Sequence, residues 1–267
     1  MKKIVKKFVK KNFSPAMQVS LIAWYGYFFG EREIRSLKRL CNNSKISIDV
    51  GANVGLISYH LRRLSLRCAA FEPNPSLCLF LEEAFGETVD VYKIALSDFV
   101  GEAKLTIPIV NGKEIHTDAS IFINPDQFLN GDQKYEKNCQ VEVPVATLDS
   151  LNFEQIGFIK IDVEGNELSV LKGAEQVLKN YKPNLLIEIE ERHRNGALAS
   201  VEDFLRVCGY RGFFDEFGVI KPIGEFRPDL HQNLGELLRA DVRDRRDIKY
   251  INNFIFVPFD RVYLLGQ

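Results

Sequence analysis

The 267-residue sequence lacks low-complexity runs and repeats of fixed period. The apolar and aromatic stretch at residues 17–29 is too short to span a bilayer, and the lysines before it break up the apolar core that a signal peptide would need. The five cysteines are odd in number and form no CxxC pair, which disfavours a disulfide framework or a zinc site. These absences argue against fibrous and disordered chains. They predict a globular protein of a reducing compartment, which we take to be the cytoplasm.

Positive charge is scarce outside the N-terminus. The chain has 35 Lys and Arg against 36 Asp and Glu, a formal net charge of −1. Six of the lysines lie in residues 1–11, which contain no acid, so the rest of the chain has 29 basic and 36 acidic residues. This mildly acidic body argues against nucleic-acid binding. We expect residues 1–44 to form a basic and aromatic helical cap; the alternative is that residues 1–29 contact a membrane surface peripherally.

From residue 45 onward, apolar strand-like runs alternate with helical patterns. This alternation is typical of βαβ units and predicts an α/β fold with a mostly parallel sheet and helices on both faces. Strands are expected at residues 46–50, 66–71, 89–96, 156–161 and 185–189, and helices at residues 54–65, 75–85 and 167–180. A further helix begins at Val201, where Ser200 is expected to act as the cap with Asp203 returning the bond.

Two parts of the chain depart from this alternation. An insertion at about 101–147 has ends at 105–110 and 139–146 that are expected to form antiparallel strands, with a polar stretch between them that could select a substrate. Residues 212–217 and 253–257 are expected to close the sheet as a terminal antiparallel hairpin. We therefore predict one domain over residues 45–267.

A glycine turn lies where the first strand gives way to a helix, in the run Asp49-Val-Gly-Ala-Asn-Val-Gly55. Gly51 allows a tight turn and admits a ligand against the backbone, and Gly55 allows the helix to pack close to the sheet. Asp49 can accept a hydrogen bond from a ligand amine or from the amides of the loop. Glu72 ends the second strand 23 residues later, where an acid can bind both hydroxyls of a ribose. The alternative is a structural turn followed by a surface glutamate.

The identity of the first residue in this turn favours one nucleoside cofactor over another. Dinucleotide folds prefer GxGxxG, in which a helix N-terminus holds a pyrophosphate. Here Asp49 occupies the first position, and its carboxylate would repel a pyrophosphate but attract the ammonium group of a methionine moiety. The turn therefore favours S-adenosylmethionine over NAD.

Several motifs together resemble the FkbM family of methyltransferases. They are Asp49 to Gly55, Phe71-Glu72-Pro-Asn74, Ala95-Leu-Ser97-Asp98, Ile159-Lys160-Ile-Asp162-Val-Glu164-Gly-Asn-Glu167, Val170 to Ala174 and Asn253 to Pro258. The resemblance covers roughly residues 45–192 and implies a class I methyltransferase with a seven-stranded Rossmann-like sheet and S-adenosyl-L-methionine as donor. The acceptors it implies are hydroxyls of sugars, glycans or polyketide-type products. An NAD-dependent oxidoreductase and a non-catalytic membrane-associated module remain as alternatives.

The resemblance assigns the cofactor-binding residues. Gly51, Asn53 and Gly55 would surround the methionine end and Glu72 the ribose. Ser97 and Asp98 are placed for the adenine amino group, or else form a turn before the following glycine.

Three charged residues near the end of the strand at 156–161 are the candidates for catalysis. If the strand stays extended, Lys160, Asp162 and Glu164 share one face and converge above the cofactor. Asp162 would position the acceptor hydroxyl, with Glu164 or Lys160 as base. The alternative is a buried ion-paired trio that orders the loop.

Further polar residues could line the same cleft, namely Glu188, Glu190, His193 and His116. Asp162, Glu164 and Glu188 would suit Mg²⁺, but their spacing does not require a metal, and we expect none. The expected partner is a small-molecule or glycan acceptor, and lipid-linked acceptors are included. The sequence does not predict an oligomeric state.

Overall fold

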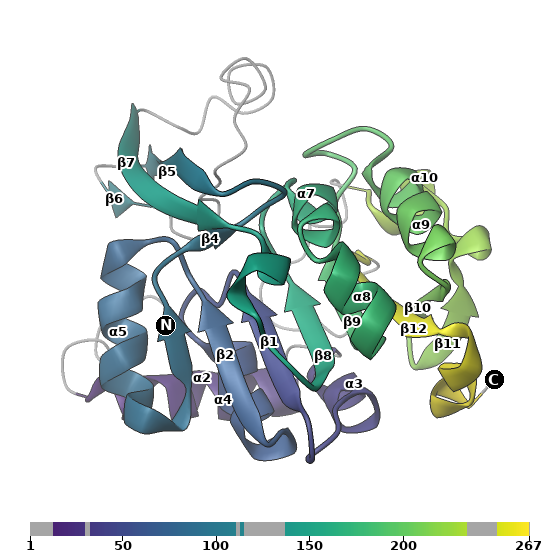
Figure 1. The fold of residues 1–267 in the computed structure, drawn as a ribbon, viewed down its shortest axis with the longest axis horizontal. Helices are drawn as coiled ribbons and strands as arrows, with labels where there is room; N and C mark the ends of the chain where they lie inside the picture. The colour runs from purple at the N-terminus through teal and green to yellow at the C-terminus, as the bar shows by residue number, and fades with distance from the viewer. Residues whose placement is uncertain (1–12, 30–32, 111–112, 115–136, 234–249, 267) are drawn as a thin grey trace.

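The computed structural model describes residues 13–29, 33–110, 113–114, 137–233 and 250–266, which form a central sheet covered by helices and a smaller second sheet (Figure 1). The central sheet has the order β11-β10-β12-β9-β8-β1-β2-β3. Its strands are β1 (Ile46–Val50), β2 (Arg67–Phe71), β3 (Asp90–Tyr92), β8 (Ile156–Ile161), β9 (Asn184–Glu188), β10 (Tyr210–Glu216), β11 (Val219–Pro222) and β12 (Asn253–Pro258). The five strands from β9 to β3 pair in parallel, and β10, β11 and β12 add antiparallel pairs at the other end.

Helices cover both faces of the central sheet, as the sequence predicts. They are α2 (Pro15–Phe29), α3 (Glu33–Leu40), α4 (Leu56–Leu64), α5 (Pro75–Phe85), α7 (Glu167–Lys172), α8 (Glu175–Tyr181), α9 (Ala197–Val207) and α10 (Pro228–His231). On one face, α7, α8 and α9 pack in the apolar cluster that contains Ile48 and Val50 of β1. On the other, α2 to α5 pack in the cluster that contains Cys68 and Ala70 of β2. Alternate residues of the strands thus belong to two separate cores.

The second sheet has the order β4-β7-β5-β6 and is formed by the predicted insertion together with part of a predicted strand. Its strands are β4 (Ala95–Leu96), β5 (Gly101–Val110), β6 (Lys113–Glu114) and β7 (Lys137–Ala146). β5 and β7 are antiparallel, which confirms that expectation. The single strand predicted at residues 89–96 is wrong, because β3 pairs with β2 whereas β4 pairs with β7 in the other sheet. Most of the polar stretch between β5 and β7 lies outside the described residues, as does His116.

The sheet also differs from the prediction at its antiparallel end. The central sheet has eight strands, because β11 follows β10 directly as a hairpin through Phe217 and Gly218, both with positive φ. The predicted antiparallel pairing of residues 212–217 with residues 253–257 is confirmed, because β10 pairs with β12. In addition, β12 pairs with β9 and so lies between β9 and β10. The predicted helix over 167–180 is two helices, separated at Gly173. A Cβ there would lie 1.9 Å from the carbonyl oxygen of Ser97, so the close contact of this backbone with the Ser97 segment needs glycine.

The N-terminal helices pack on the same core as α4 and α5. Val19 and Ala23 of α2 and Leu37 of α3 are buried. The division into a cap at residues 1–44 and a domain at 45–267 stays a prediction, and residues 1–12 lie outside the described part of the chain. Within that part, no helix is both long and apolar enough to cross a membrane.

Helix α9 begins four residues earlier than predicted, because a different side chain caps it. The carboxylate of Glu191 accepts hydrogen bonds from the backbone amides of Gly196 (2.6 Å) and Leu198 (3.0 Å) at the start of the helix. Ser200 lies inside the helix, where its hydroxyl donates to the carbonyl of Gly196 at 2.8 Å. An acid from the preceding loop therefore supplies the negative charge that favours a helix N-terminus.

Removing this cap should destabilise the protein measurably. We expect Glu191→Ala to lower the free energy of unfolding by about 1–2 kcal/mol, because two amides at the helix start lose their acceptor. Ser200→Ala is the matched control and should cost about 0.5 kcal/mol or less, since its hydroxyl bond is internal to the helix. Urea denaturation of both variants measures the loss in free energy of unfolding at each position. A larger loss for Ser200→Ala would restore Ser200 as the main cap.

Candidate active site

The turn between β1 and α4 has three residues in the left-handed region: Gly51 and Gly55 with φ of +79°, and Asn53 with φ of 50°. The amide of Gly51 donates to the carbonyl of Phe71 at the end of β2 (2.9 Å). A Cβ on Gly51 would lie 1.8 Å from the carbonyl oxygen of Asp162, just past the end of β8. The loop is therefore wedged between the carboxyl ends of β2 and β8, which leaves no room for a side chain.

The second glycine of the turn has a different neighbour from the one predicted. A Cβ on Gly55 would lie 2.5–2.8 Å from side-chain atoms of Phe85 and Leu81, both on α5. Gly55 thus allows α4 to start close against α5, rather than against the sheet. The requirement for glycine is retained, but its cause is helix–helix packing.

Asp49 is buried at the carboxyl end of β1. Its Oδ2 accepts a hydrogen bond from the hydroxyl of Ser58 on α4 at 2.5 Å. Burial raises the pKa of the Asp49 carboxyl to about 6, although Ser58 and the ammonium of Lys160 act to lower it. A buried carboxylate in this position is stabilised by any cationic group that binds beside it.

Glu72 ends the stretch from β2 in the same way, and it is buried rather than on the surface. One carboxylate oxygen accepts the amide of Asn53 (2.8 Å) and the other the amide of Asn74 (2.9 Å). Burial raises the pKa of Glu72 to about 7, against the lowering effect of these two amides. Glu72 therefore connects the glycine turn to the start of α5 through hydrogen bonds. The sequence predicts a ribose contact for Glu72 but not this structural role.

Ser97 and Asp98 follow β4 and differ in exposure. Ser97 is buried; its hydroxyl donates to Oδ1 of Asp98 at 3.3 Å and accepts from the side-chain amide of Asn166 at 3.4 Å. Asp98 is exposed. The backbone amide of Ser97 donates a hydrogen bond to the carbonyl of Ala146 (3.0 Å), and the carbonyl of Ser97 lies close against Gly173. An adenine-binding role for the pair stays a prediction.

The charged run after β8 does not keep the alternation that the sequence suggests. The strand ends at Ile161, and Glu164 has a positive φ of 51°. Lys160 is buried and donates to the side-chain oxygen of Asn253 at 2.9 Å, with Glu188 3.9 Å away. Lys160 and Glu164 therefore meet different partners instead of sharing one extended face.

Glu164 pairs with a histidine that the sequence treats as a minor candidate. Its Oε2 lies 2.7 Å from Nε2 of His193. Burial raises the pKa of Glu164, and the pairing with His193 opposes that rise. Burial alone would lower the pKa of His193, but the carboxylate of Glu164 raises it above its ordinary value. The two side chains thus form an ion pair when His193 is protonated.

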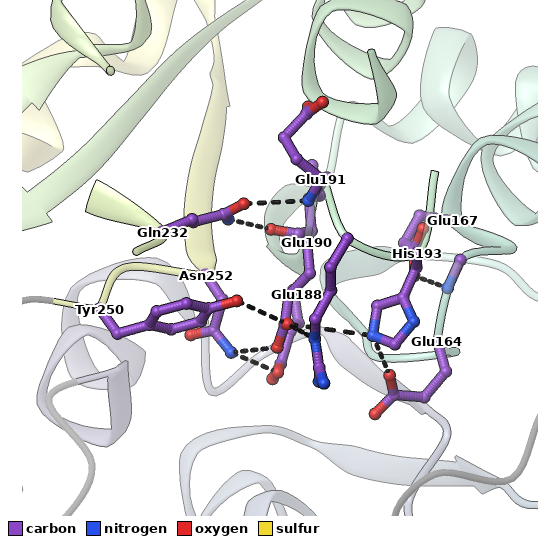
Figure 2. A network of polar contacts seen from close by, with 12 residues as sticks. Glu164, Glu167, Glu188, Glu190, Glu191, His193, Gln232, Tyr250 and Asn252 are labelled. Atoms are coloured by element: carbon purple, nitrogen blue, oxygen red, sulfur yellow. Dashed lines mark hydrogen bonds and ion pairs between the residues drawn. The ribbon is translucent and has the colours of Figure 1, made fainter. Parts of the chain in front are cut away.

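A polar network extends from this pair to the end of β9 (Figure 2). Oε2 of Glu190 accepts from the hydroxyl of Tyr250 at 2.7 Å and also from Arg192, and lies 3.9 Å from Nε2 of His193. The side-chain amide of Asn252 donates to both Glu190 and Glu188, as the dashed lines in Figure 2 show.

Residues before β12 therefore complete a cluster whose acids lie at or just after the ends of β8 and β9. Sequence reasoning missed Tyr250, Asn252 and Arg192 in this cluster. The first two lie more than 80 residues from the motif after β8. The signal available was the polar Asn252-Asn253 pair directly before an apolar strand.

Asp162 lies near most of these acids. Burial is the main cause of the raised pKa of each carboxyl, and the negative charge of Asp162 adds to it for Asp49, Glu72, Glu164 and Glu188. These side chains come from the ends of β1, β2, β8 and β9, which meet at one edge of the sheet. In the described residues, no group of three or more His, Cys, Asp or Glu is arranged to hold a metal ion.

The arrangement defines a class of protein. A mostly parallel sheet is followed, at the carboxyl end of its central strand, by an acid and a glycine turn, with a second buried acid after the neighbouring strand. This is the architecture of a class I methyltransferase.

The chain belongs to the FkbM family of methyltransferases, because the Methyltransferase FkbM domain matches its residues 49–211. Methyltransferase sdnD of Sordaria araneosa is 24% identical over 213 residues, which cover 68% of this chain and 77% of that protein. The AMB antimetabolite synthetase AmbE of Pseudomonas aeruginosa is 27% identical over 200 residues, 62% of this chain but only 9% of that protein. The predicted family is therefore confirmed.

A solved structure shows the same fold. The crystal structure of methyltransferase FkbM from Methylobacillus flagellatus KT matches with a TM-score of 0.50 and 16% identity. The match covers 80% of this chain and 44% of that one, so this chain spans less than half of that protein.

Proposed function

We propose that this chain transfers a methyl group from S-adenosylmethionine to a hydroxyl of a sugar, glycan or other small hydroxylated acceptor. One observation carries the proposal: Asp49 and Glu72, both buried, flank the glycine turn at the ends of β1 and β2. Two desolvated carboxyls at a turn that excludes side chains favour a ligand with a cationic group and a pair of hydroxyls.

The residues of the turn fit this cofactor. Each oxygen of Glu72 accepts one backbone amide, and a carboxylate oxygen has a second acceptor direction that a ribose hydroxyl can use. An ammonium beside Asp49 would hold its carboxylate ionised despite burial. The bound cofactor supplies an electrophilic methyl group on a sulfonium.

The acceptor needs a group to take its proton. When the oxygen–carbon bond forms and the carbon–sulfur bond breaks, the hydroxyl proton must leave the acceptor oxygen. The Glu164–His193 pair suits this step, because both side chains are about one quarter exposed and their 2.7 Å contact can receive a proton. Lys160 suits it less well, since its ammonium is buried and donates to Asn253. Asp162, whose charge acts on both Asp49 and Glu164, would orient the hydroxyl.

Cofactor binding is the first test. Calorimetry with S-adenosylhomocysteine should show a saturable site, and Asp49→Asn and Glu72→Gln should each weaken it at least tenfold, because each removes an ionised acceptor. Glu83→Gln, the same type of exchange at an exposed position of α5, controls for loss of charge. Absence of binding to the unsubstituted protein would overturn the proposal.

Methyl transfer is the second test. Radiolabelled S-adenosylmethionine and a panel of methyl glycosides should give labelled product, and replacing a free hydroxyl by hydrogen should abolish it at one position. His193→Gln should lower the rate roughly 100-fold or more, with S-adenosylhomocysteine binding unchanged within about twofold. A His193→Gln variant of full activity would remove the pair from the proton transfer, and label found only on amines would refute O-methylation.

A further inference from the structure

Helix α2 exposes large apolar side chains along one face. Met17, Leu21, Trp24 and Tyr25 follow one another at helical spacing and are 43–58% exposed. The opposite face, with Val19 and Ala23, is buried against the core that contains α4 and α5. The helix contains no charged residue at all. An α-helix that is apolar on both sides is ordinarily covered on both sides, so this exposed face favours a partner.

Cationic groups border α2 on the neighbouring helices. Nζ of Lys38 on α3 lies 5.8 Å from the ring centroid of Tyr27 on α2. On α4, which packs against α2, the guanidinium of Arg63 lies 4.6 Å from the ring centroid of Tyr59. The sequence adds six lysines in residues 1–11, shortly before α2 begins. The apolar face is thus accompanied by positive charge.

We propose that the exposed face of α2 docks in the plane of an anionic membrane surface. Tryptophan and tyrosine are the side chains that favour the boundary between lipid headgroups and acyl chains, and adjacent basic residues add attraction to anionic lipids. At 15 residues, α2 is suited to lie in this boundary and is too short to cross it. This surface goes beyond the proposed chemistry and does not depend on it.

A second copy of the chain is a weaker occupant for this face. A two-fold dimer brings the same surface of both copies together, so Lys38 and Arg63 of each copy would approach those of the other. An uncharged helix also offers no group that could compensate this repulsion. An anionic lipid surface complements the same charges.

The single tryptophan of the chain makes the docking directly observable, because it is Trp24. Mixed with vesicles of phosphatidylcholine and 30% phosphatidylglycerol, the full chain should co-sediment, and the emission of Trp24 should shift to shorter wavelength. Vesicles of phosphatidylcholine alone should bind at least tenfold more weakly, and added salt should weaken binding to the anionic vesicles.

Matched variants distinguish binding through this face from nonspecific binding of exposed apolar side chains to vesicles. Met17→Ser with Leu21→Ser should weaken vesicle binding at least tenfold, whereas Val207→Ser with Leu230→Ser, at exposed positions of α9 and α10, should leave it unchanged. Thermal melting checks that both double variants fold. Equal binding by the two, or no emission shift of Trp24, overturns the proposal. A dimer that the first pair of substitutions dissociates, with no vesicle binding, would instead assign the face to a second copy.

Discussion

Gly51→Ala should lower the free energy of unfolding by more than about 4 kcal/mol or prevent folding altogether. The added Cβ would lie 1.8 Å from the carbonyl oxygen of Asp162, and this oxygen belongs to backbone that cannot rotate away. The φ of +79° adds roughly 1–2 kcal/mol of conformational cost for a residue with a side chain. Relief requires β1 and the end of β8 to separate, although the two strands are hydrogen-bonded along their length.

A glycine elsewhere in the chain isolates the contribution of the clash. Gly218 has a φ of +93°, but a Cβ there would meet nothing within 4 Å. Gly218→Ala should therefore show only the conformational cost, about 1–2 kcal/mol. Urea denaturation measures the free energy of unfolding of both variants. If Gly51→Ala is too unstable for this measurement, the yields of folded protein are compared instead. Similar losses for both variants would mean that the loop moves freely away from Asp162.

The ligand-free protein should lose stability as the pH rises from about 4.5 to about 7, and Glu72→Gln should remove much of this loss. The pKa of Glu72 is about 7 in the folded protein, against an ordinary value of 4.5. The folded state therefore binds the proton more tightly, and this advantage is complete below pH 4.5 and gone above pH 7. At about 1.4 kcal/mol per unit, the difference corresponds to roughly 3 kcal/mol for this one carboxyl.

Asp49, with a pKa of about 6, and Glu167, with a pKa of about 7, also lower the stability of the folded protein as the pH rises. Glu72→Gln therefore removes only part of the dependence of stability on pH. Thermal unfolding at pH 5 and pH 8 measures the change, with Glu83→Gln as the control for removal of a carboxylate on α5. Stability that rises over this window in the unsubstituted protein would contradict the prediction.

The sequence predicts those elements well that have strong local signals. β1, β8 and α5 occur at their predicted positions, because an apolar run bounded by polar residues marks each strand, and Pro75 marks the first turn of α5. The family and its fold also follow, because the motifs occur in order along the chain.

Other features depend on contacts that no local pattern contains. Glu191 caps α9 from the preceding loop, and its residue type does not distinguish it from a surface acid. The left-handed backbone of Glu164 breaks the two-residue alternation, which places this side chain beside His193. Of the polar cluster after β9, the sequence identifies the acids but not Tyr250 and Asn252, since these are brought there by the pairing of β12.

The position of β12 has a consequence for the order in which the site can form. Among the described strands, β12 is the last to be synthesised, yet it lies between β9 and β10 in the sheet. During synthesis, both neighbours are complete while the edges that will receive β12 are still unpaired, and such edges promote aggregation. Asn253 accepts a hydrogen bond from Lys160, and Asn252 donates hydrogen bonds to Glu188 and Glu190. The cluster is therefore complete only after this strand inserts. Folding of the glycine turn between β1 and α4 can precede this step, whereas the polar cluster around Glu188 and Glu190 must wait for it.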